Sequence, residues 1–381
     1  MISDPLLLFA FMFAVVAFTR WLEGRYVWVE KISSAVVCTL LGILLANIGV
    51  TPHASPTFDA VFTFAIPYAI VLVIMSSDLK ELMKAGKPMI LMFVVASVGS
   101  FVGGLGAGVL FTPVVGPETW KLSGAFSGAF AGGGMNFAAV GQGLDIDPST
   151  FAAAAVADNL STVPYLLLQV GLVGVLGTLF FRRTGKDATA LELEPGEDPT
   201  ALRRIWTDSS VSITDLAMLA AIPLAALWVA RQLGEVLPGI PEVLWLTTLA
   251  LVLAQLPWIR MIRGAEMVSY FALHIFFIAL GAASVVADVF EAGLPIFLFM
   301  FVIIGVHVVV AYVAGWLLRI DLPTVSVASQ AAIGGPGSAL ALGMAMGWHK
   351  LVMPGVLVGI FGYALGNYLG FACAYLVNLL V

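Results

Sequence analysis

The chain has 381 residues, of which 61% are hydrophobic and only 10% are charged, and its formal net charge at pH 7 is -6. Because a soluble domain carries about 25% charged residues, this composition excludes a soluble globular protein and predicts a polytopic membrane protein. The sequence has two cysteines, far apart in apolar segments, and no zinc, phosphate-loop or nucleotide-binding motif. We therefore expect no disulfide framework, no cofactor and no bound nucleic acid.

Apolar segments long enough to cross a bilayer, which takes about 20 residues, recur along the whole chain. In the first half they lie at 5–20, 32–50, 58–77 and 88–111, followed by a Gly-rich stretch at 122–145 and a long segment at 149–181. In the second half they lie at 213–232, 242–258, 266–288 and 293–318, followed by a Gly-rich stretch at 324–347 and a last segment at 351–380. Each half therefore offers four spans, a Gly-rich stretch and a long final segment.

This shared plan predicts an internal repeat. The motif Gly-Gly-Gly-Met-Asn at 132–136 corresponds to Gly-Gly-Pro-Gly-Ser at 334–338, 202 residues later. The one polar stretch between the halves contains several charged residues of both signs. We divide the chain into a first repeat at 1–181, a linker at 182–212 and a second repeat at 213–381.

Lysine and arginine favour cytoplasmic loops, and their distribution predicts the orientation of the repeats. With the linker 182–212 in the cytoplasm and neither Gly-rich stretch crossing the membrane, 15 of the 17 lysines and arginines lie inside. Each half then crosses an odd number of times, so the second half enters the membrane the opposite way round. The predicted fold class is an all-α polytopic membrane protein with an inverted-topology repeat, in the bacterial cytoplasmic (inner) membrane. Each half has about five transmembrane helices plus a Gly-rich re-entrant hairpin or broken helix.

Four segments carry a resemblance to a known family: Ala-Gly-Gly-Gly-Met-Asn-Phe at 131–137, Ala-Val-Ala-Asp-Asn at 155–159, Gly-Gly-Pro-Gly-Ser-Ala at 334–339, and the stretch 347–367. They resemble the YjcL-like membrane protein family (domain of unknown function 819), over nearly the whole chain. That family is distantly similar to sodium/glutamate symporters, 2-hydroxycarboxylate symporters and cation/proton antiporters, in which paired hairpins or crossed broken helices form the site. The resemblance implies ion-coupled transport by an elevator motion and a homodimer, and it names no substrate.

The two Gly-rich stretches are candidate ligand sites, because glycine adopts positive φ and lets a ligand approach the backbone. Carbonyl and amide groups freed by a helix break bind cations and anions. The first stretch supplies candidate ion ligands, and its asparagine is also a candidate substrate ligand: Gly132, Gly133, Gly134 and Asn136. The second stretch supplies candidate substrate ligands: Gly334, Gly335, Gly337 and Ser338. In the alternative interpretation, these glycines are only helix-packing contacts and a structural kink.

Asp158 is the one acidic residue that lies well inside a predicted span, where a carboxylate costs about 3 kcal/mol or more. Asn159, Ser161 and Thr162 bring amide and hydroxyl oxygens within about one turn of it, and hard cations take oxygen ligands. Pro164 predicts a break in this helix, because it lacks a backbone N–H. We therefore predict an ion site with sodium or a proton on Asp158. Asp158 and Asn159 also resemble the paired Asp/Asn on a core helix of cation/proton antiporters, and this resemblance implies the same. In the alternative interpretation, Asp158 pairs with a histidine or a helix end.

The last segment has no acidic residue, and its polar side chains Tyr363 and Asn367 predict a neutral, hydrogen-bonding part of the substrate site. Alternatively, these side chains satisfy one another within the helix bundle. His274 and His307 lie inside predicted spans, and we interpret each as a hydrogen-bonded structural group rather than a ligand.

These observations favour an ion-coupled secondary transporter, not an enzyme, that carries a small organic solute such as an amino acid, an organic anion or a short peptide. The coupling ion is sodium or a proton, and the scaffold around the site is expected to form a homodimer. An ion channel is the first alternative, because selectivity filters also use glycine and backbone carbonyls. An intramembrane enzyme is the second, and it lacks a visible nucleophile and base beside the single deep carboxylate.

Overall fold

The computed structural model describes the chain except for residues 1, 3, 27–33, 76–78, 186–210 and 238. Most of the predicted linker, 182–212, therefore lies outside the described residues. Within the described part of the chain, all regular secondary structure is helical.

Helices of the first half alternate with short turns, and the last of them is the longest. They are α1 (Pro5–Arg25), α3 (Ser34–Asn47), α4 (Pro56–Met75), α5 (Leu79–Leu82), α6 (Lys87–Val115), α7 (Thr119–Ala129), α8 (Gly134–Gly143) and α9 (Pro148–Thr184). The second half follows the same order with α11 (Ile213–Val236), α12 (Glu242–Ala254), α13 (Ala265–Ala282), α14 (Val286–Leu317), α15 (Leu322–Ala345) and α16 (His349–Leu380).

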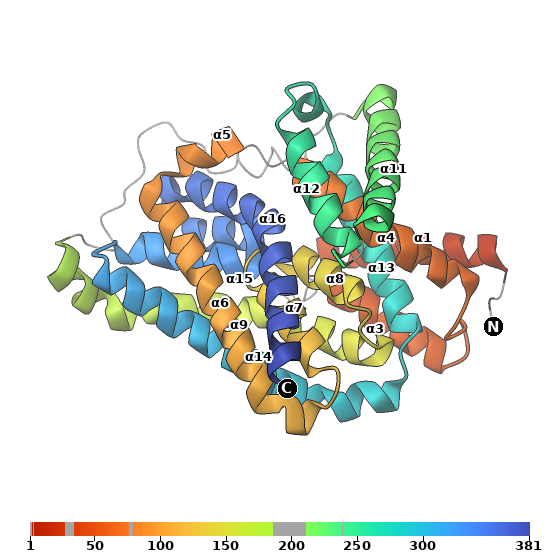
Figure 1. The fold of residues 1–381 in the computed structure, drawn as a ribbon, viewed down its shortest axis with the longest axis horizontal. Helices are drawn as coiled ribbons and strands as arrows, with labels where there is room; N and C mark the ends of the chain where they lie inside the picture. The colour runs from red at the N-terminus through yellow and green to blue at the C-terminus, as the bar shows by residue number, and fades with distance from the viewer. Residues whose placement is uncertain (1, 3, 27–33, 76–78, 186–210, 238) are drawn as a thin grey trace.

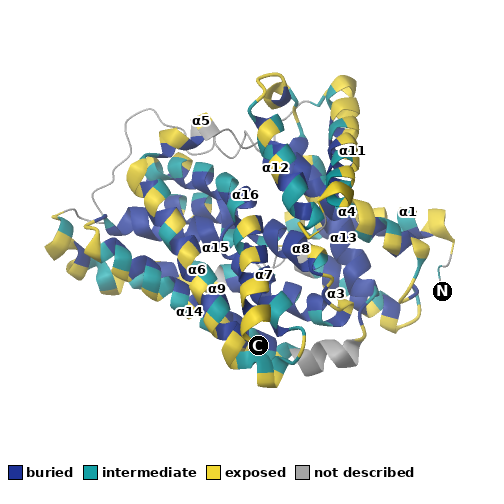
Figure 2. Cartoon of the chain, viewed as in Figure 1, coloured by how far each residue is buried: buried dark blue, intermediate teal, exposed yellow. Residues whose placement is uncertain are grey.

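Eight of the described helices are long and apolar enough to cross a membrane: α1, α4, α6, α9, α11, α13, α14 and α16. Large apolar side chains on their outer faces are exposed, including Leu110 and Val175, while the centre of the molecule is buried (Figure 2). Exposed apolar surface on this scale indicates a protein embedded in lipid. The prediction of an all-α polytopic membrane protein is confirmed.

Helix starts follow the sequence through capping side chains. The carboxylates of Asp4, Asp147 and Asp321 accept hydrogen bonds from backbone amides in the first turns of α1, α9 and α15. Ser212 forms a capping box with Asp215 at the start of α11. Such caps satisfy amides that have no partner inside the helix, so short polar turns are enough to end one helix and begin the next.

The structure corrects the predicted helix boundaries in two places and removes one predicted break. The span predicted at 242–258 ends at Ala254, because Pro257 disfavours a helical residue before it. The spans predicted at 266–288 and 293–318 meet in a turn at 283–285 instead of near 290. The predicted break at Pro164 is absent, since α9 continues through it. A single missing N–H in a long helix is tolerated in membrane proteins.

The helices form two groups that sit side by side (Figure 1). One group contains α6–α9 and α14–α16, in which α14 packs along α6 and α15 along α16. The other contains α1, α3, α4 and α11–α13, in which α13 packs on both α3 and α4 and α12 packs on α4. We call the first group the core bundle and the second the scaffold bundle. All residues of the two Gly-rich motifs lie in the core bundle.

Candidate functional site

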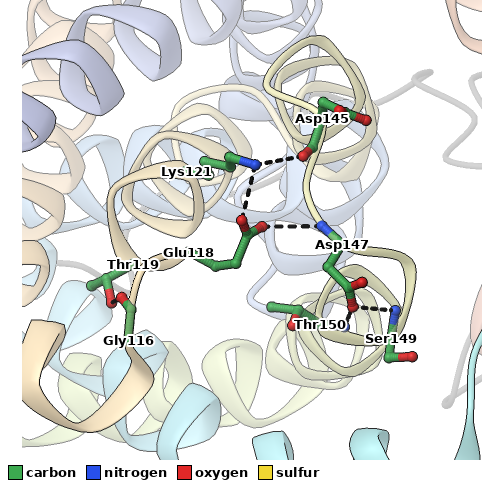
Figure 3. A network of polar contacts seen from close by, with 8 residues as sticks. All are labelled: Gly116, Glu118, Thr119, Lys121, Asp145, Asp147, Ser149 and Thr150. Carbon is green, nitrogen blue, oxygen red and sulfur yellow. Dashed lines mark hydrogen bonds and ion pairs between the residues drawn. The ribbon is translucent and has the colours of Figure 1, made fainter.

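The first Gly-rich stretch forms two short helices that lie beside each other. Between α7 and α8 the chain turns at Gly133, which has φ 96° and ψ 179°. At the opposite ends of these helices, Lys121 Nζ donates to the carbonyl of Asp145 at 2.6 Å and pairs with Glu118 at 2.9 Å. Glu118 also accepts from the amide of Asp147 at 3.0 Å (Figure 3). The beginning of α7 and the end of α8 are therefore tied together, and the turn at Gly133 is the tip of a hairpin.

The second Gly-rich stretch also doubles back. Inside α15, Gly335 has φ 71° and ψ -167°, which interrupts the helix. Ser338 Oγ donates to the carbonyl of Gln330 at 3.0 Å, although residues eight apart in a continuous helix are separated by about 12 Å. We call residues 322–334 the first arm of α15 and residues 336–345 the second arm. The predicted interruption of regular helix at this motif is confirmed.

The two interruptions meet in the middle of the core bundle. A methyl group added at Gly133 would lie 3.4 Å from the backbone N and Cα of Gly335. A methyl group at Gly335 would lie 3.5 Å from the carbonyl oxygen of Gly132. Both Gly133 and Gly335 adopt a backbone conformation that is essentially restricted to glycine. The sequence predicts two breaks, and the structure brings them into contact.

Helix α16 passes against both tips without intervening side chains. A methyl group at Gly359 would lie 2.7 Å from the backbone N of Pro336, and one at Gly362 would lie 2.8 Å from the carbonyl oxygen of Ala131. Side chains at these positions would force the backbones apart, so glycine is required by the close approach. The glycines of α16 thus act as packing contacts for the two tips.

Asp158 lies beside the first tip. Its side chain is 5% exposed, and a methyl group at Gly134, the first residue of α8, would lie 3.4 Å from its Oδ2. No hydrogen bond or ion pair to this carboxylate is found among the described residues. A buried, unpaired carboxylate is costly, and the partial positive charge at a helix N-terminus offsets only part of that cost. The position therefore calls for a proton or a cation.

The other predicted ion ligands on α9 are arranged differently. Asn159 donates its amide to the carbonyl of Ala155 at 2.8 Å, and the Ser161 hydroxyl donates to the carbonyl of Asp158 at 2.6 Å. Both donors are thus used on their own helix. Thr162 faces the second tip, since a methyl group at Gly334 would lie 3.1 Å from its Cγ2. Of these three side chains, Thr162 alone is placed against a tip by a described contact.

Asn136 connects the first hairpin to α16 and to the scaffold bundle. Its Nδ2 donates to the carbonyl of Tyr363 at 2.7 Å and to Asn367 Oδ1 at 2.9 Å. Asn367 Nδ2 in turn donates to Thr247 Oγ1 on α12 at 2.9 Å. Asn136 Oδ1 is buried and has no hydrogen-bond partner among the described residues, so it is an unsatisfied acceptor beside the first tip. Sequence reasoning missed Thr247, because nothing distinguishes it from other threonines in apolar segments.

The second hairpin leaves open space beside its tip. Gly337 is exposed, and a methyl group there would meet no atom within 4 Å. Gln330 in the first arm is buried, and neither polar atom of its side chain has a partner among the described residues. An unpaired buried amide is costly, so Gln330 is an unsatisfied polar group in the first arm. The sequence offered Gln330 only as a polar residue near the motif.

A separate groove of about 380 Å³ lies in the scaffold bundle between α1, α4 and α13. Its lining is apolar apart from Tyr68, whose hydroxyl donates to the carbonyl of Leu219 at 2.9 Å. The groove contains no carboxylate and none of the tip glycines. We therefore place the candidate site at the meeting hairpins, beside Asp158 and the unpaired polar atoms of Asn136 and Gln330.

Comparison with known proteins agrees with the sequence motifs. The family described as "Protein of unknown function (DUF819)" matches residues 10–380. The chain is also similar to "Uncharacterized membrane protein YjcL" of Bacillus subtilis (strain 168), with 27% identity over 382 residues that cover 97% of this chain and 96% of that protein. The predicted resemblance is confirmed over nearly the whole chain.

Proposed function

Because the chain belongs to the DUF819 family of membrane proteins, whose description gives no function, we propose a function from the site itself. The protein is an ion-coupled secondary transporter of a small organic solute. The observation that carries this proposal is Asp158, a buried carboxylate without a described partner that lies beside the contact between two helix interruptions. Ionisable residues and broken helices at one point in the membrane are the usual composition of a transporter site.

The two hairpins are re-entrant in this proposal. The tie between the start of α7 and the end of α8 (Figure 3) supports an entry and an exit on the same side of the membrane. The hydrogen bond across the interruption of α15 supports the same for the second hairpin. Their tips meet from opposite sides, which is the arrangement expected when the halves of the chain are inverted repeats.

Packing of the helices supports the inverted repeat. If α3, α4, α6 and α9 correspond to α12, α13, α14 and α16, each contact between the halves should occur twice. The pair α3–α13 has its counterpart in α12–α4, and the pair α9–α14 has its counterpart in α16–α6. Contact of α7 with α16 is matched by contact of α15 with α9. Gly133 and Gly335, 202 residues apart, also share one backbone conformation.

Sodium or a proton binds at Asp158, and the solute binds next to it. Asn136 Oδ1 is a second acceptor for the ion. The amides at the start of α8 favour an anionic group of the solute, and Ser338 and Tyr363 in the wall of the site suit hydrogen-bonding groups. An amino acid, a small organic anion or a short peptide fits these features.

Transport proceeds by movement of the core bundle against the scaffold bundle. Few of the described polar contacts join them near the site: Asn367 with Thr247 at 2.9 Å, Tyr368 with Thr248 at 2.7 Å, and the hydroxyls of Tyr363 and Tyr270 at 3.5 Å. These bonds can break and reform with modest cost as the core moves. The scaffold bundle forms the homodimer, in the bacterial cytoplasmic membrane with the linker 182–212 inside the cell.

The test is the thermal stability of the purified protein in sodium, potassium or choline chloride at two pH values, for wild type and Asp158→Asn. A ligand that binds only the folded state raises stability by mass action, by about 2.7 kcal/mol at 100 times its Kd. Asp59→Asn, which changes an exposed acid in α4, is the matched control. We expect sodium, or lowered pH, to stabilise wild type and the control but not Asp158→Asn. Equal responses of all three proteins would overturn the proposal.

A further inference from the structure

A chain of buried, hydrogen-bonded side chains crosses the core bundle, and none of its members is among the ligands proposed above. It links α15, α14, α9 and α6 and ends on a backbone carbonyl at the end of α7. Its members are Ser326, Tyr312, Gln169, Tyr165, Ser329, His307 and Ser100. Every one of these side chains is at least nine-tenths buried, so their hydrogen bonds are made within the protein or not at all.

The direction of the first bonds follows from one acceptor. The carbonyl of Phe130 can only accept, so Ser100 Oγ donates its single proton to it at 2.6 Å. Ser100 Oγ must then accept from His307 Nδ1, which lies 2.8 Å away. A neutral imidazole has one N–H, so His307 Nε2 is an acceptor, and Ser329 Oγ donates to it at 2.8 Å.

The remaining bonds are then fixed in turn. Because the Ser329 proton is used, Tyr165 donates to Ser329 Oγ at 2.6 Å. The Tyr165 oxygen accepts from Gln169 Nε2 at 2.6 Å, and Gln169 Oε1 accepts from the hydroxyl of Tyr312. Ser326 therefore donates to the Tyr312 oxygen at 2.9 Å. Each hydroxyl proton is used once, and all bonds point in one direction, toward the first hairpin.

This chain of hydrogen bonds joins the two hairpins through the imidazole ring of His307. Ser329 belongs to the first arm of α15, six residues before Gly335, and Phe130 closes α7, three residues before Gly133. We propose that His307 is a positioning residue for both tips and that it acts as a neutral imidazole with its proton on Nδ1. The role rests on the proposed function, because the tips are positioned for ligand binding between them.

The Nδ1–H form is the one that satisfies both neighbours. With the proton on Nε2, the lone pair of Nδ1 would face Ser100 Oγ, whose single proton is already donated to the carbonyl of Phe130. Ser329 would also have to donate to Tyr165, which reverses the bonds beyond it. Removing the ring leaves two buried hydroxyls without their partner, at the place where the hairpins are held in register. Loss of His307 should therefore change the affinity of the site between the tips, and not only overall stability.

The protonation state is tested by solid-state NMR of the protein in lipid bilayers with ¹⁵N-labelled histidine. The signal of His307 is assigned from its loss in His307→Phe. We expect Nδ1 to carry the proton and Nε2 to be unprotonated near neutral pH. A proton on Nε2, or on both nitrogens, would overturn the directed chain. This measurement does not depend on whether the protein is a transporter.

Positioning is tested with a matched control. His274 in α13 is also buried and bonded on both ring nitrogens, to Ser34 Oγ at 2.8 Å and to the carbonyl of Tyr270 at 2.7 Å, but it lies in the scaffold bundle. We expect the sodium concentration for half-maximal stabilisation to rise about tenfold in His307→Phe, equivalent to about 1.4 kcal/mol, and to stay near the wild-type value in His274→Phe. His307→Asn, which keeps a donor toward Ser100, should recover part of the loss. Equal shifts in the two Phe variants would refute positioning.

If neither sodium nor lowered pH stabilises wild type, the proposed function fails, and a double-mutant cycle still decides whether His307 connects the hairpins. The probes are Ser100→Ala and Ser329→Ala, whose effects on unfolding are compared singly and together. We expect them to be non-additive in wild type and additive in His307→Phe. Additivity in both backgrounds would show that the ring transmits nothing between the two serines.

Discussion

Replacing Gly335 with alanine tests whether the second tip depends on a glycine conformation. Its φ of 71° and ψ of -167° lie in a region that is essentially restricted to glycine, where strain costs about 1–3 kcal/mol. Steric conflict adds little, since the nearest atom to the new methyl group is the carbonyl oxygen of Gly132 at 3.5 Å. We therefore expect Gly335→Ala to lower the free energy of unfolding by about 1–3 kcal/mol, almost all of it backbone strain.

The assay is equilibrium unfolding in mixed micelles of increasing SDS content, with two further variants for comparison. Gly337→Ala is the matched control, because its methyl group meets no atom within 4 Å and alanine in a helix stabilises by about 0.5–1 kcal/mol relative to glycine. Gly359→Ala should cost more than Gly335→Ala, because its methyl group would lie 2.7 Å from the backbone N of Pro336. Equal stabilities of the Gly335 and Gly337 variants would refute the reasoning.

Two further predictions concern the hydrogen bonds and the topology. Asn367→Ala removes one of the two acceptors of the Asn136 amide and the donor to Thr247 Oγ1, while the bonds of Asn136 to Tyr363 and of Thr247 to Val243 remain. We therefore expect a loss of about 1–3 kcal/mol in the same micelle assay; a change within error would contradict the described bonds. In a background without native cysteines, Asp145→Cys should react with a membrane-impermeant thiol reagent added outside cells, and Arg319→Cys only after permeabilisation. The reverse pattern would refute the proposed orientation.

The positions of most helices could be predicted because long apolar segments and polar turns are local properties of the sequence. The Gly-Gly-Pro-Gly motif predicted a helix interruption for the same reason, since proline and glycine act on their own backbone. Helix boundaries inside continuous apolar stretches were predicted less accurately than helix positions. The segment around Gln255 remains apolar on both sides, and Pro257 ends α12 before the hydropathy changes.

Contacts between distant segments could not be predicted in the same way. Asp158 was identified by its charge, which is unusual in an apolar segment, and the structure places it next to Gly134. Ser100 and Thr247 carry no such signal, because serine and threonine in membrane helices commonly bond to their own backbone. His307 was correctly interpreted as hydrogen-bonded, but its two partners are 207 and 22 residues away. Because these partners are far away in the sequence, the sequence alone does not show that His307 connects both hairpins.

In the proposed repeat α9 corresponds to α16, but the two helices pack differently against the tips. On the α16 side, Gly362 packs against the first tip so closely that a methyl group would lie 2.8 Å from backbone atoms. On the α9 side, Thr162 takes the place against Gly334, and its side chain keeps the helix away from the tip. Beyond it, Gly337 faces open space. Asp158 on α9 has no acidic counterpart on α16, so the repeat and the site proposed above predict one ion site instead of two.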